Sequence, residues 1–300
     1  MDRSAEIADF LRSRRARITP DQVGLPDDGR PRRVPGLRRD EVARLAGVST
    51  EYYTRLEQGR SAHPSTAVLD ALARVLRLDE TEREHLADLC ARSRPARRSP
   101  EAPQRVRPGL HLTLQTLEQV PAFVLGRRTE VLAANRLARA VLTDFDALPA
   151  PRRQLARWML LDPGARERCT DWEQLAAETV AMLRFEAGRH PDDRRLADLV
   201  GELTLSCTEF SGWWNDHRVL RRTHGVKRYH HPDVGDLTFA YESFPVPGSP
   251  DQTLCVYNAE PGSATQKALR LLGDWTAPAV SPDAGAGAHR PGTGGSGRRP

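Results

Sequence analysis

Five polar residues share one side of a predicted helix: Thr50, Glu51, Thr54, Arg55 and Gln58. Successive helical residues are about 100° apart, so this spacing turns four of them outward and leaves Thr50 at the N-terminal rim. An arginine can donate two hydrogen bonds to guanine, a glutamine can pair with adenine, and a glutamate can accept from cytosine. The chemistry that these side chains offer is the recognition of base edges in the DNA major groove.

The flanking sequence predicts the elements that would position this polar face. A first helix is expected before Gly47, which suits a sharp turn with an unusual backbone angle. Ser49 then caps a second helix. The residues expected to face inward are Val42, Ala46, Tyr53 and Leu56. A helix, a short turn with glycine and a second helix form a helix-turn-helix unit.

Arg38 and Arg39 begin the first helix, where positive charge opposes the helix dipole. This position is explained if both arginines face DNA phosphates. Tyr52 is either a packing residue or a further phosphate contact, and Glu57 is a cap or an ion-pair partner. The segment Thr19–Gly36 is either an arm on DNA or a flexible loop, and its three arginines, close to the helix-turn-helix, favour the arm. The alternative is a helical protein–protein interaction module or scaffold that does not read DNA, because every amphipathic helix pair has a polar outer face.

The charge distribution favours the first interpretation. The 300 residues include 45 Lys and Arg against 40 Asp and Glu, a net charge of +5. Residues 1–107 hold 22 arginines and 17 acidic residues, so they carry the whole excess, and residues 108–300 are neutral. All five tryptophans lie in the second part. A basic part next to a neutral, aromatic-rich part predicts two domains with different partners.

Several other classes of protein are not expected. No apolar run approaches the length of a membrane span, and the first residues lack the apolar core of a signal peptide. We therefore expect a cytoplasmic, nucleoid-associated protein without membrane contact. No cofactor, no metal and no enzymatic activity are expected, because catalytic and phosphate-binding motifs are missing. The histidines whose spacing fits no metal motif are His217, His224, His230 and His231.

Composition divides the chain into four parts. Residues 4–91 are predicted as an all-helical DNA-binding domain, and residues 92–107 as a basic, proline-rich linker. Residues 108–276 form a mixed ligand-binding and dimerisation domain, and residues 277–300 a disordered tail. The elements predicted in the mixed domain are a hairpin of 122–126 with 130–134, a helix from Asn135, a helical region over 151–225, and strands at 235–244 and 253–259.

Eight residues of the second domain are candidates for a ligand pocket. Aromatic side chains could line an apolar pocket, and three polar side chains could hold a ligand carboxylate. The candidates are Trp158, Trp172, Trp214, Phe239, Tyr257, Arg168, Arg184 and His231. For most of them the competing interpretation is a place in the core or a surface ion pair.

Several blocks of sequence resemble one family of bacterial regulators. The segment DEVARLAGVSTEYYTRLEQGR is similar to the helix-turn-helix of the xenobiotic-response-element (Xre) family. Over about residues 4–275 the chain resembles actinobacterial MmyB-like regulators. The blocks that carry this resemblance, in order, are VPGLRRDEVARLAGVSTEYYTRLEQGR, PAFVLGRRTEVLAANRLARAVL, DWEQLAAETVAMLR and HHPDVGDLTFAYESF.

The resemblance implies an all-α helix-turn-helix domain followed by an α+β, PAS-like ligand-binding domain. It also implies a transcriptional regulator that senses a small apolar ligand, such as a fatty acid. The strand–strand–helix order ending at Asn135 suits a PAS-like half-barrel. Because a single helix-turn-helix presents too small a surface for strong selectivity, we expect a homodimer on a palindromic double-stranded DNA operator.

Overall fold

The computed structural model describes residues 3–25, 36–60, 63–91, 104–221 and 223–276. Most of the predicted linker and the whole predicted tail lie outside these ranges. So do three arginines of the predicted arm, Arg30, Arg32 and Arg33.

The N-terminal domain is entirely helical in its described residues, as predicted. Its apolar core includes Ile7, Phe10, Leu72 and Leu86, each at most 1% exposed. Serine and aspartate side chains cap the helices: Ser65 Oγ accepts from the Val68 amide at 3.4 Å. The elements are α1 (Arg3–Arg17), the 3-10 turn η1 (Asp21–Val23), α2 (Arg39–Ala46), α3 (Thr50–Glu57), α4 (Thr66–Val75) and α5 (Glu80–Cys90).

The C-terminal domain contains a five-stranded antiparallel sheet in the order β2-β1-β5-β4-β3. The predicted hairpin and the last two predicted strands are confirmed, although β4 and β5 run longer. The strand β3 was not predicted. Its inward side chains include Lys227 and His231, so its alternation is not a simple apolar one. The strands are β1 (Ala122–Leu125), β2 (Val131–Ala134), β3 (His224–His231), β4 (Gly235–Val246) and β5 (Ser249–Asn258).

Helices cover both faces of the sheet. Along β1, Phe123 and Leu125 join the main core, whereas Val124 points to the opposite face and packs with Leu110 and Leu114 of α6 (Pro108–Thr116). The main core is closed by the remaining helices. These are α7 (Arg136–Val141), α8 (Leu155–Leu161), α9 (Pro163–Arg168), α10 (Trp172–Arg189), α11 (Arg194–Ser206), α12 (Phe210–Asn215) and α13 (Ala264–Trp275), with 3-10 turns η2 (Phe145–Ala147) and η3 (Ala150–Arg152).

Asn135 begins α7, as predicted, and joins three segments. Its Oδ1 accepts from the amides of Ala122 and Ala138, at 3.1 and 2.9 Å. Its Nδ2 donates to the carbonyls of Leu117 and Val120, both at 2.7 Å. This one side chain therefore fixes the start of β1, the start of α7 and the segment after α6.

All four cysteines are buried, and none of them forms a disulfide bond. Burial raises the pKa of the Cys90 thiol and of the Cys169 thiol to about 12. Cys90 ends α5 in the N-terminal domain, whereas Cys169, Cys207 and Cys255 belong to the core of the C-terminal domain.

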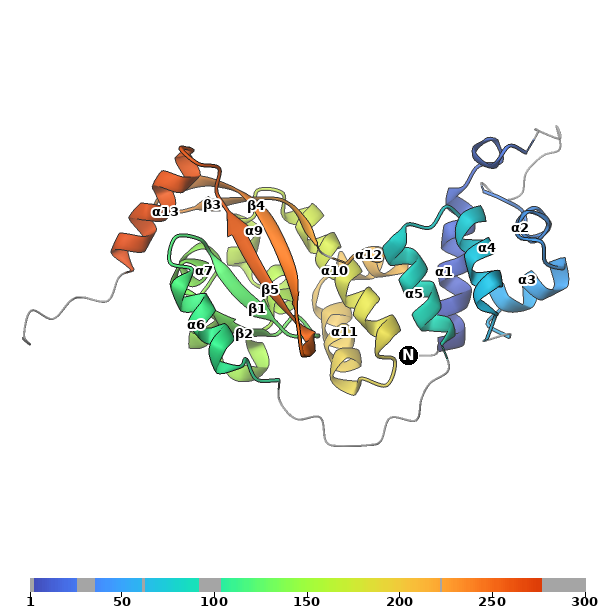
Figure 1. The fold of residues 1–300 in the computed structure, drawn as a ribbon, viewed down its shortest axis with the longest axis horizontal. Coiled ribbons are helices and arrows are strands. Elements are labelled where there is room, and N and C mark those ends of the chain that lie inside the picture. Colours follow the sequence, from blue (N-terminus) through green and yellow to red (C-terminus); the bar gives the residue numbers. More distant parts are fainter. Residues whose placement is uncertain (1–2, 26–35, 61–62, 92–103, 222, 277–300) are drawn as a thin grey trace, which may run out of the picture.

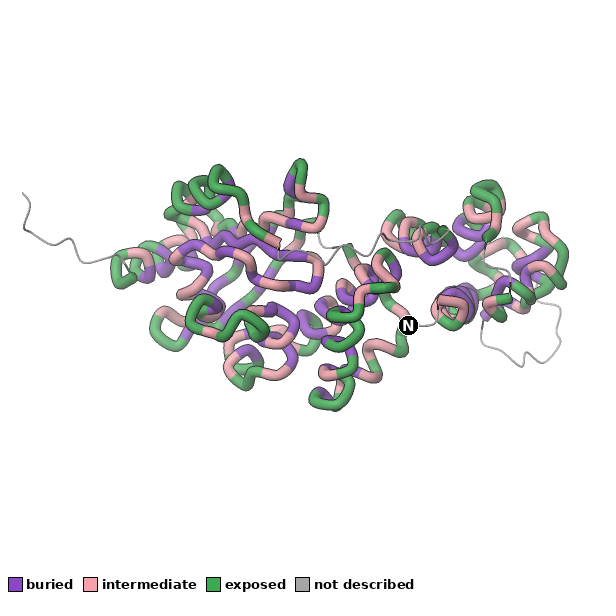
Figure 2. Tube along the Cα trace, turned by 90° about the horizontal axis from the view of Figure 1, so that it is seen from below, coloured by how far each residue is buried: buried purple, intermediate pink, exposed green. Residues whose placement is uncertain are grey.

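The two domains meet along α10. In Figure 1, α10, α11 and α12 lie between the sheet and the N-terminal helices, and α3 lies at the end remote from the sheet. Figure 2 shows buried segments in the centre of each half. We call the contact of α10, α12 and residues 216–221 with α1 and α5 the domain junction. Its polar pairs are Arg184–Glu6, Arg17–Asp216, Arg221–Glu84 and Arg189–Asp88, and Arg14 donates to the His217 carbonyl at 2.6 Å.

Candidate functional site

The turn between α2 and α3 has the predicted geometry. Gly47 has a φ of +69°, a conformation that favours glycine, and its amide donates back to α2. Ser49 Oγ accepts from the Tyr52 amide at 3.1 Å and so caps α3. Tyr53 and Leu56 are fully buried. The α2–turn–α3 unit is therefore a helix-turn-helix.

The five predicted base-contacting residues lie on the outer side of this unit. Thr50, Glu51, Arg55 and Gln58 are exposed, and Thr54 is half-buried. Their helix is at the outer end of the molecule in Figure 1, where the described residues of the C-terminal domain do not cover it. These five side chains are thus accessible to DNA, and their contacts with bases stay a prediction.

Ion pairs around the buried carboxylate of Glu57 join α3 to α1 and α2. The Glu57 carboxylate is fully buried, and it accepts from Arg15 at 2.7 Å and from Arg39 at 3.0 Å. Arg15 also donates to the Leu37 carbonyl at 2.7 Å, which ties α1 to the start of α2. Burial, with the nearby Glu57 charge, raises the pKa of Tyr53. The interpretation of Glu57 as an ion-pair partner is confirmed, whereas Arg15 was missed because it lies 42 residues away.

The three residues predicted to contact phosphates differ in their exposure and in their contacts within the protein. Arg39 is held by Glu57 but keeps 42% of its side chain exposed. The Arg38 amide donates to Glu41 Oε2 at 2.6 Å, which closes the first turn of α2. Tyr52 is half-buried. Arg38 is half-buried and Arg39 is exposed at the start of α2, and their proposed role on phosphates stays a prediction.

Most of the predicted pocket residues are core or support residues. Trp158, Phe239 and Tyr257 are at most 4% exposed and pack in the main core. Trp172 donates to the Met159 carbonyl at 2.8 Å, below the guanidinium of Arg166. At least four cavities open on the described residues of the C-terminal domain, and of the eight candidates Trp158 alone lines one of these four, beside α8.

The polar candidates are also engaged elsewhere. Arg168 and His231 both point to the Ala140 carbonyl at the end of α7, at 3.3 and 3.2 Å. Arg184 and Trp214 lie in the domain junction, where the guanidinium is 4.2 Å from the indole centroid. The position of Arg184 in a predicted helical region does not reveal that α1 lies against it.

The four cavities have volumes of about 370 to 630 Å³. One of them, which we call the junction cavity, has a volume of about 450 Å³ and lies between α10 and the sheet. Its residues come from β1, α10, the segment before β3, and the β4–β5 hairpin. They include Leu125, Met182, Phe185, Glu186, Arg189 and Asp251.

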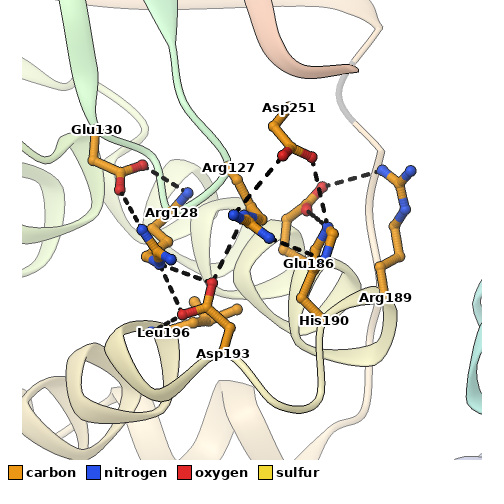
Figure 3. A network of polar contacts seen from close by, with 9 residues as sticks. All are labelled: Arg127, Arg128, Glu130, Glu186, Arg189, His190, Asp193, Leu196 and Asp251. Atoms are coloured by element: carbon orange, nitrogen blue, oxygen red, sulfur yellow. Dashed lines mark hydrogen bonds and ion pairs between the residues drawn. The ribbon is translucent and has the colours of Figure 1, made fainter. Parts of the chain in front are cut away.

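A polar network lies next to the junction cavity (Figure 3), and four of its residues line that cavity: Arg127, Glu186, Arg189 and Asp251. Arg128 is buried and donates to both oxygens of Asp193, at 2.9 and 2.8 Å. Its neighbour Arg127 donates to His190 Nδ1 at 3.1 Å and lies 3.7 Å from Asp193. Asp193 Oδ1 also caps α11 by accepting from the Leu196 amide at 3.0 Å. The network therefore joins the β1–β2 turn to α10 and α11.

The shifted pKa values in this network include those of Glu186 and His190. Burial raises the pKa of Glu186 to about 7, against the opposing effect of Arg189. Burial, with the charge of Arg127, lowers the pKa of His190. At neutral pH the network thus holds a carboxyl of Glu186 that is partly protonated and an imidazole of His190 that is neutral.

Neither a metal cluster nor a membrane helix occurs in the described ranges. Within that part of the chain, no group of three His, Cys, Asp or Glu residues is placed to hold a metal ion. Over the same residues, no helix is both long and apolar enough to cross a membrane.

Comparison with known families agrees with the two-domain arrangement. A helix-turn-helix domain model matches residues 6–86, and a model of the MmyB-like transcription regulator ligand binding domain matches residues 106–272. A search among curated proteins found no match. The second model covers more than half of the chain. The chain therefore belongs to the MmyB-like transcription regulators, in which a DNA-binding helix-turn-helix domain is joined to a ligand-binding domain.

Proposed function

We propose that this regulator recognises a specific, palindromic operator as a homodimer. The observation that supports this best is that the predicted base-contacting side chains lie on the outer face of α3. This helix is held by the Ser49 cap, by its buried inner face and by the ion pairs of Glu57. Rigid support matters because base recognition requires side chains held at fixed positions. One eight-residue helix offers few base contacts, so two copies related by a two-fold axis are needed for selectivity.

The proposed ligand of the C-terminal domain is a small apolar molecule of the fatty-acid type. The volumes of the four cavities in the C-terminal domain fall within the range of about 300 to 1,000 Å³ that small-molecule sites occupy. The domain is proposed to act by binding alone, without catalysis. Ligand binding alters operator affinity only if it favours one arrangement of the protein over another.

The test of DNA recognition is a salt titration of the intact chain on genomic fragments. We expect affinity to fall steeply with salt, and the slope to decrease by about one unit in Arg38→Ala, which removes a phosphate contact. Arg270→Ala, on the exposed side of α13 at the far end of the molecule, is the control. Absence of binding to every fragment at low salt would favour the scaffold alternative.

Two further measurements address the finer points. Light scattering of the purified chain at increasing concentration should give twice the monomer mass. Mass spectrometry of an organic extract of the same sample should identify a co-purified lipid. A monomer at all concentrations contradicts the dimer, and an empty protein that also fails to bind added palmitate contradicts the fatty-acid ligand.

A further inference from the structure

The junction cavity differs from the other three cavities in its position. Its apolar walls include Leu125 and Cys255 from the sheet, and Met182 and Phe185 from α10. The same helix lies beside α5 of the DNA-binding domain (Figure 1), and Phe185 and Arg189 of α10 contact both the cavity and that domain. A molecule in this cavity would therefore contact the helix that joins the two domains.

The charges around the cavity favour an acidic group on the ligand. Three arginines, Arg127, Arg189 and Arg221, line it together with Asp251 and Glu186. Because the pKa of Glu186 is about 7, its repulsion of an incoming carboxylate is weakened at neutral pH. Arg189 is about one third exposed, and its ion pairs with Asp88 and Glu186 are 3.7 and 3.6 Å long. Both distances exceed that of a good hydrogen bond, so an acid at Arg189 would gain shorter contacts.

Phe185 belongs to the cavity and to the core of the other domain at once. It lines the junction cavity and is 3% exposed in the cluster formed by α1 to α5. Its ring lies 6.2 Å from the ring of His85, which in turn lies 5.1 Å from Phe10. Movement of Phe185 therefore changes the packing of α5 and α1 directly.

The approach of α10 to α5 is too close for a side chain. A Cβ atom added at Gly188 would overlap Cε1 and Nδ1 of His85, which is 1% exposed. His85 is enclosed and has no room to give way without moving α5. The contact is therefore tight, and small shifts of α10 displace α5.

We propose that the junction cavity is the sensor site for an apolar ligand with one acidic group, held at Arg189, and that its occupancy is transmitted to the DNA-binding domain through Phe185 and His85. This rests on the proposed function in one respect, that the C-terminal domain binds an apolar ligand. A ligand tail that displaces the Phe185 ring loosens α5 from α10. The helix-turn-helix then loses its fixed orientation relative to the C-terminal domain.

The first test concerns the ligand class. Palmitate and methyl palmitate are titrated into the delipidated intact chain, with affinities measured by calorimetry. Palmitate should bind, and Arg189→Gln should weaken it about tenfold or more, since it removes a charge-assisted hydrogen bond. The neutral ester should be insensitive to that change. Arg194→Gln, an exposed arginine of α11 that lines none of the four cavities, is the control. The acidic-group assignment is overturned if the ester binds and palmitate does not, or if wild type and Arg189→Gln bind palmitate equally. Failure of both compounds to bind contradicts the proposed apolar ligand itself.

The second test concerns the transmission and needs no ligand. Hydrogen exchange is compared in Gly188→Ala and Gly201→Ala, two helical glycines of which only the first would place a methyl group against another element. We expect exchange in α5 to be about tenfold faster in Gly188→Ala alone, with the sheet unchanged as a monitor of folding. If Gly188→Ala does not fold, Phe185→Ala replaces it, with the same expectation.

A third variant applies the disturbance from the cavity side. Met182→Trp fills part of the cavity one turn before Phe185 and should also accelerate exchange in α5. Unchanged exchange in α5 in both Gly188→Ala and Met182→Trp overturns the coupling. Failure of the wild-type chain to bind any DNA would contradict the proposed function but not the coupling, because exchange in α5 is measured without DNA.

Discussion

Arg184 in α10 and Glu6 in α1 form an ion pair of 2.5 Å across the domain junction, although 178 residues separate them. The Arg184 side chain is 2% exposed and also donates to the Trp214 carbonyl. Burial lowers its pKa, against the opposing effect of Glu6. Separation of the domains would leave this charge without its partner until water reached it, so the junction opens only with a definite cost in free energy.

The base-contacting role of Arg55 predicts a change in selectivity. Arg55→Ala should weaken operator binding by about 1–3 kcal/mol and relax the preference at one base pair, because a bidentate contact with guanine is lost. The measurement is a competition assay with a set of single-base operator variants. Equal weakening on all sequences would show that Arg55 contacts phosphate only.

The buried carboxylate of Glu57 predicts a loss of stability in the DNA-binding domain. Glu57→Gln leaves Arg15 and Arg39 without a counter-charge, and Arg15 is almost fully buried. We expect the free energy of unfolding to fall by about 3–5 kcal/mol, as for other broken buried pairs. Urea denaturation followed by circular dichroism measures this. Glu51→Gln, an exposed glutamate of the same helix, is the control and should stay near wild type.

The enclosed imidazole of His85 predicts a pH dependence. Burial, then the charges of Arg184 and Arg14, lower its pKa from 6.5 to about 3. Between these values the unfolded chain binds a proton that folded His85 does not, so the free energy of unfolding decreases as the pH falls, by up to about 1.4 kcal/mol per pH unit. The lowered pKa of His217 likewise decreases the free energy of unfolding as the pH falls. The raised pKa of Glu186 increases it as the pH falls.

Comparison of wild type with a variant that lacks the imidazole isolates the contribution of His85 to this pH dependence. The slope of stability against pH from 6.5 to 4.5 should be smaller in His85→Gln than in wild type, as measured by thermal or urea unfolding. His230→Gln removes an exposed histidine that pairs with Asp236 and serves as the control. Identical slopes in wild type and His85→Gln would show that His85 is not held neutral.

The network of Figure 3 predicts that Asp193 stabilises by its charge. Asparagine can still cap α11 through its side-chain oxygen, so Asp193→Asn removes mainly the ion pairs with Arg127 and Arg128. We expect a loss of about 3 kcal/mol in the free energy of unfolding of the C-terminal domain. Asp192→Asn changes the exposed neighbour and should have little effect. Calorimetric unfolding of both variants makes the comparison, and equal stability would contradict the assigned role.

Local patterns predicted the local elements. Gly47, Ser49 and Asn135 each act within a few residues of their own position, so their turns and caps follow from the sequence. The antiparallel hairpin of β1 and β2 is local in the same sense. The helix α13 was missed because its apolar stripe of Ala268, Leu269 and Leu272 directly precedes a segment rich in glycine and proline.

Contacts between distant segments were not predictable in this way. Trp214 and Arg184 were candidates for a ligand pocket, yet both lie at the domain junction, because α1 and α5 pack against α10 and α12. The junction cavity was missed for the same reason: its walls come from β1, α10 and the β4–β5 hairpin, which no single window of sequence brings together.

The four buried cysteines make the folded chain resistant to thiol reagents, since the thiolate is the reactive form and burial raises the pKa values of Cys90, Cys169 and Cys207. Alkylation thus reports opening rather than surface exposure. Modification of Cys90 records opening of α5, whereas modification of Cys255 records opening beside the cavity. Each domain therefore contains at least one cysteine whose rate of alkylation reports local opening. The order of opening events can be followed in this way without introducing a foreign label.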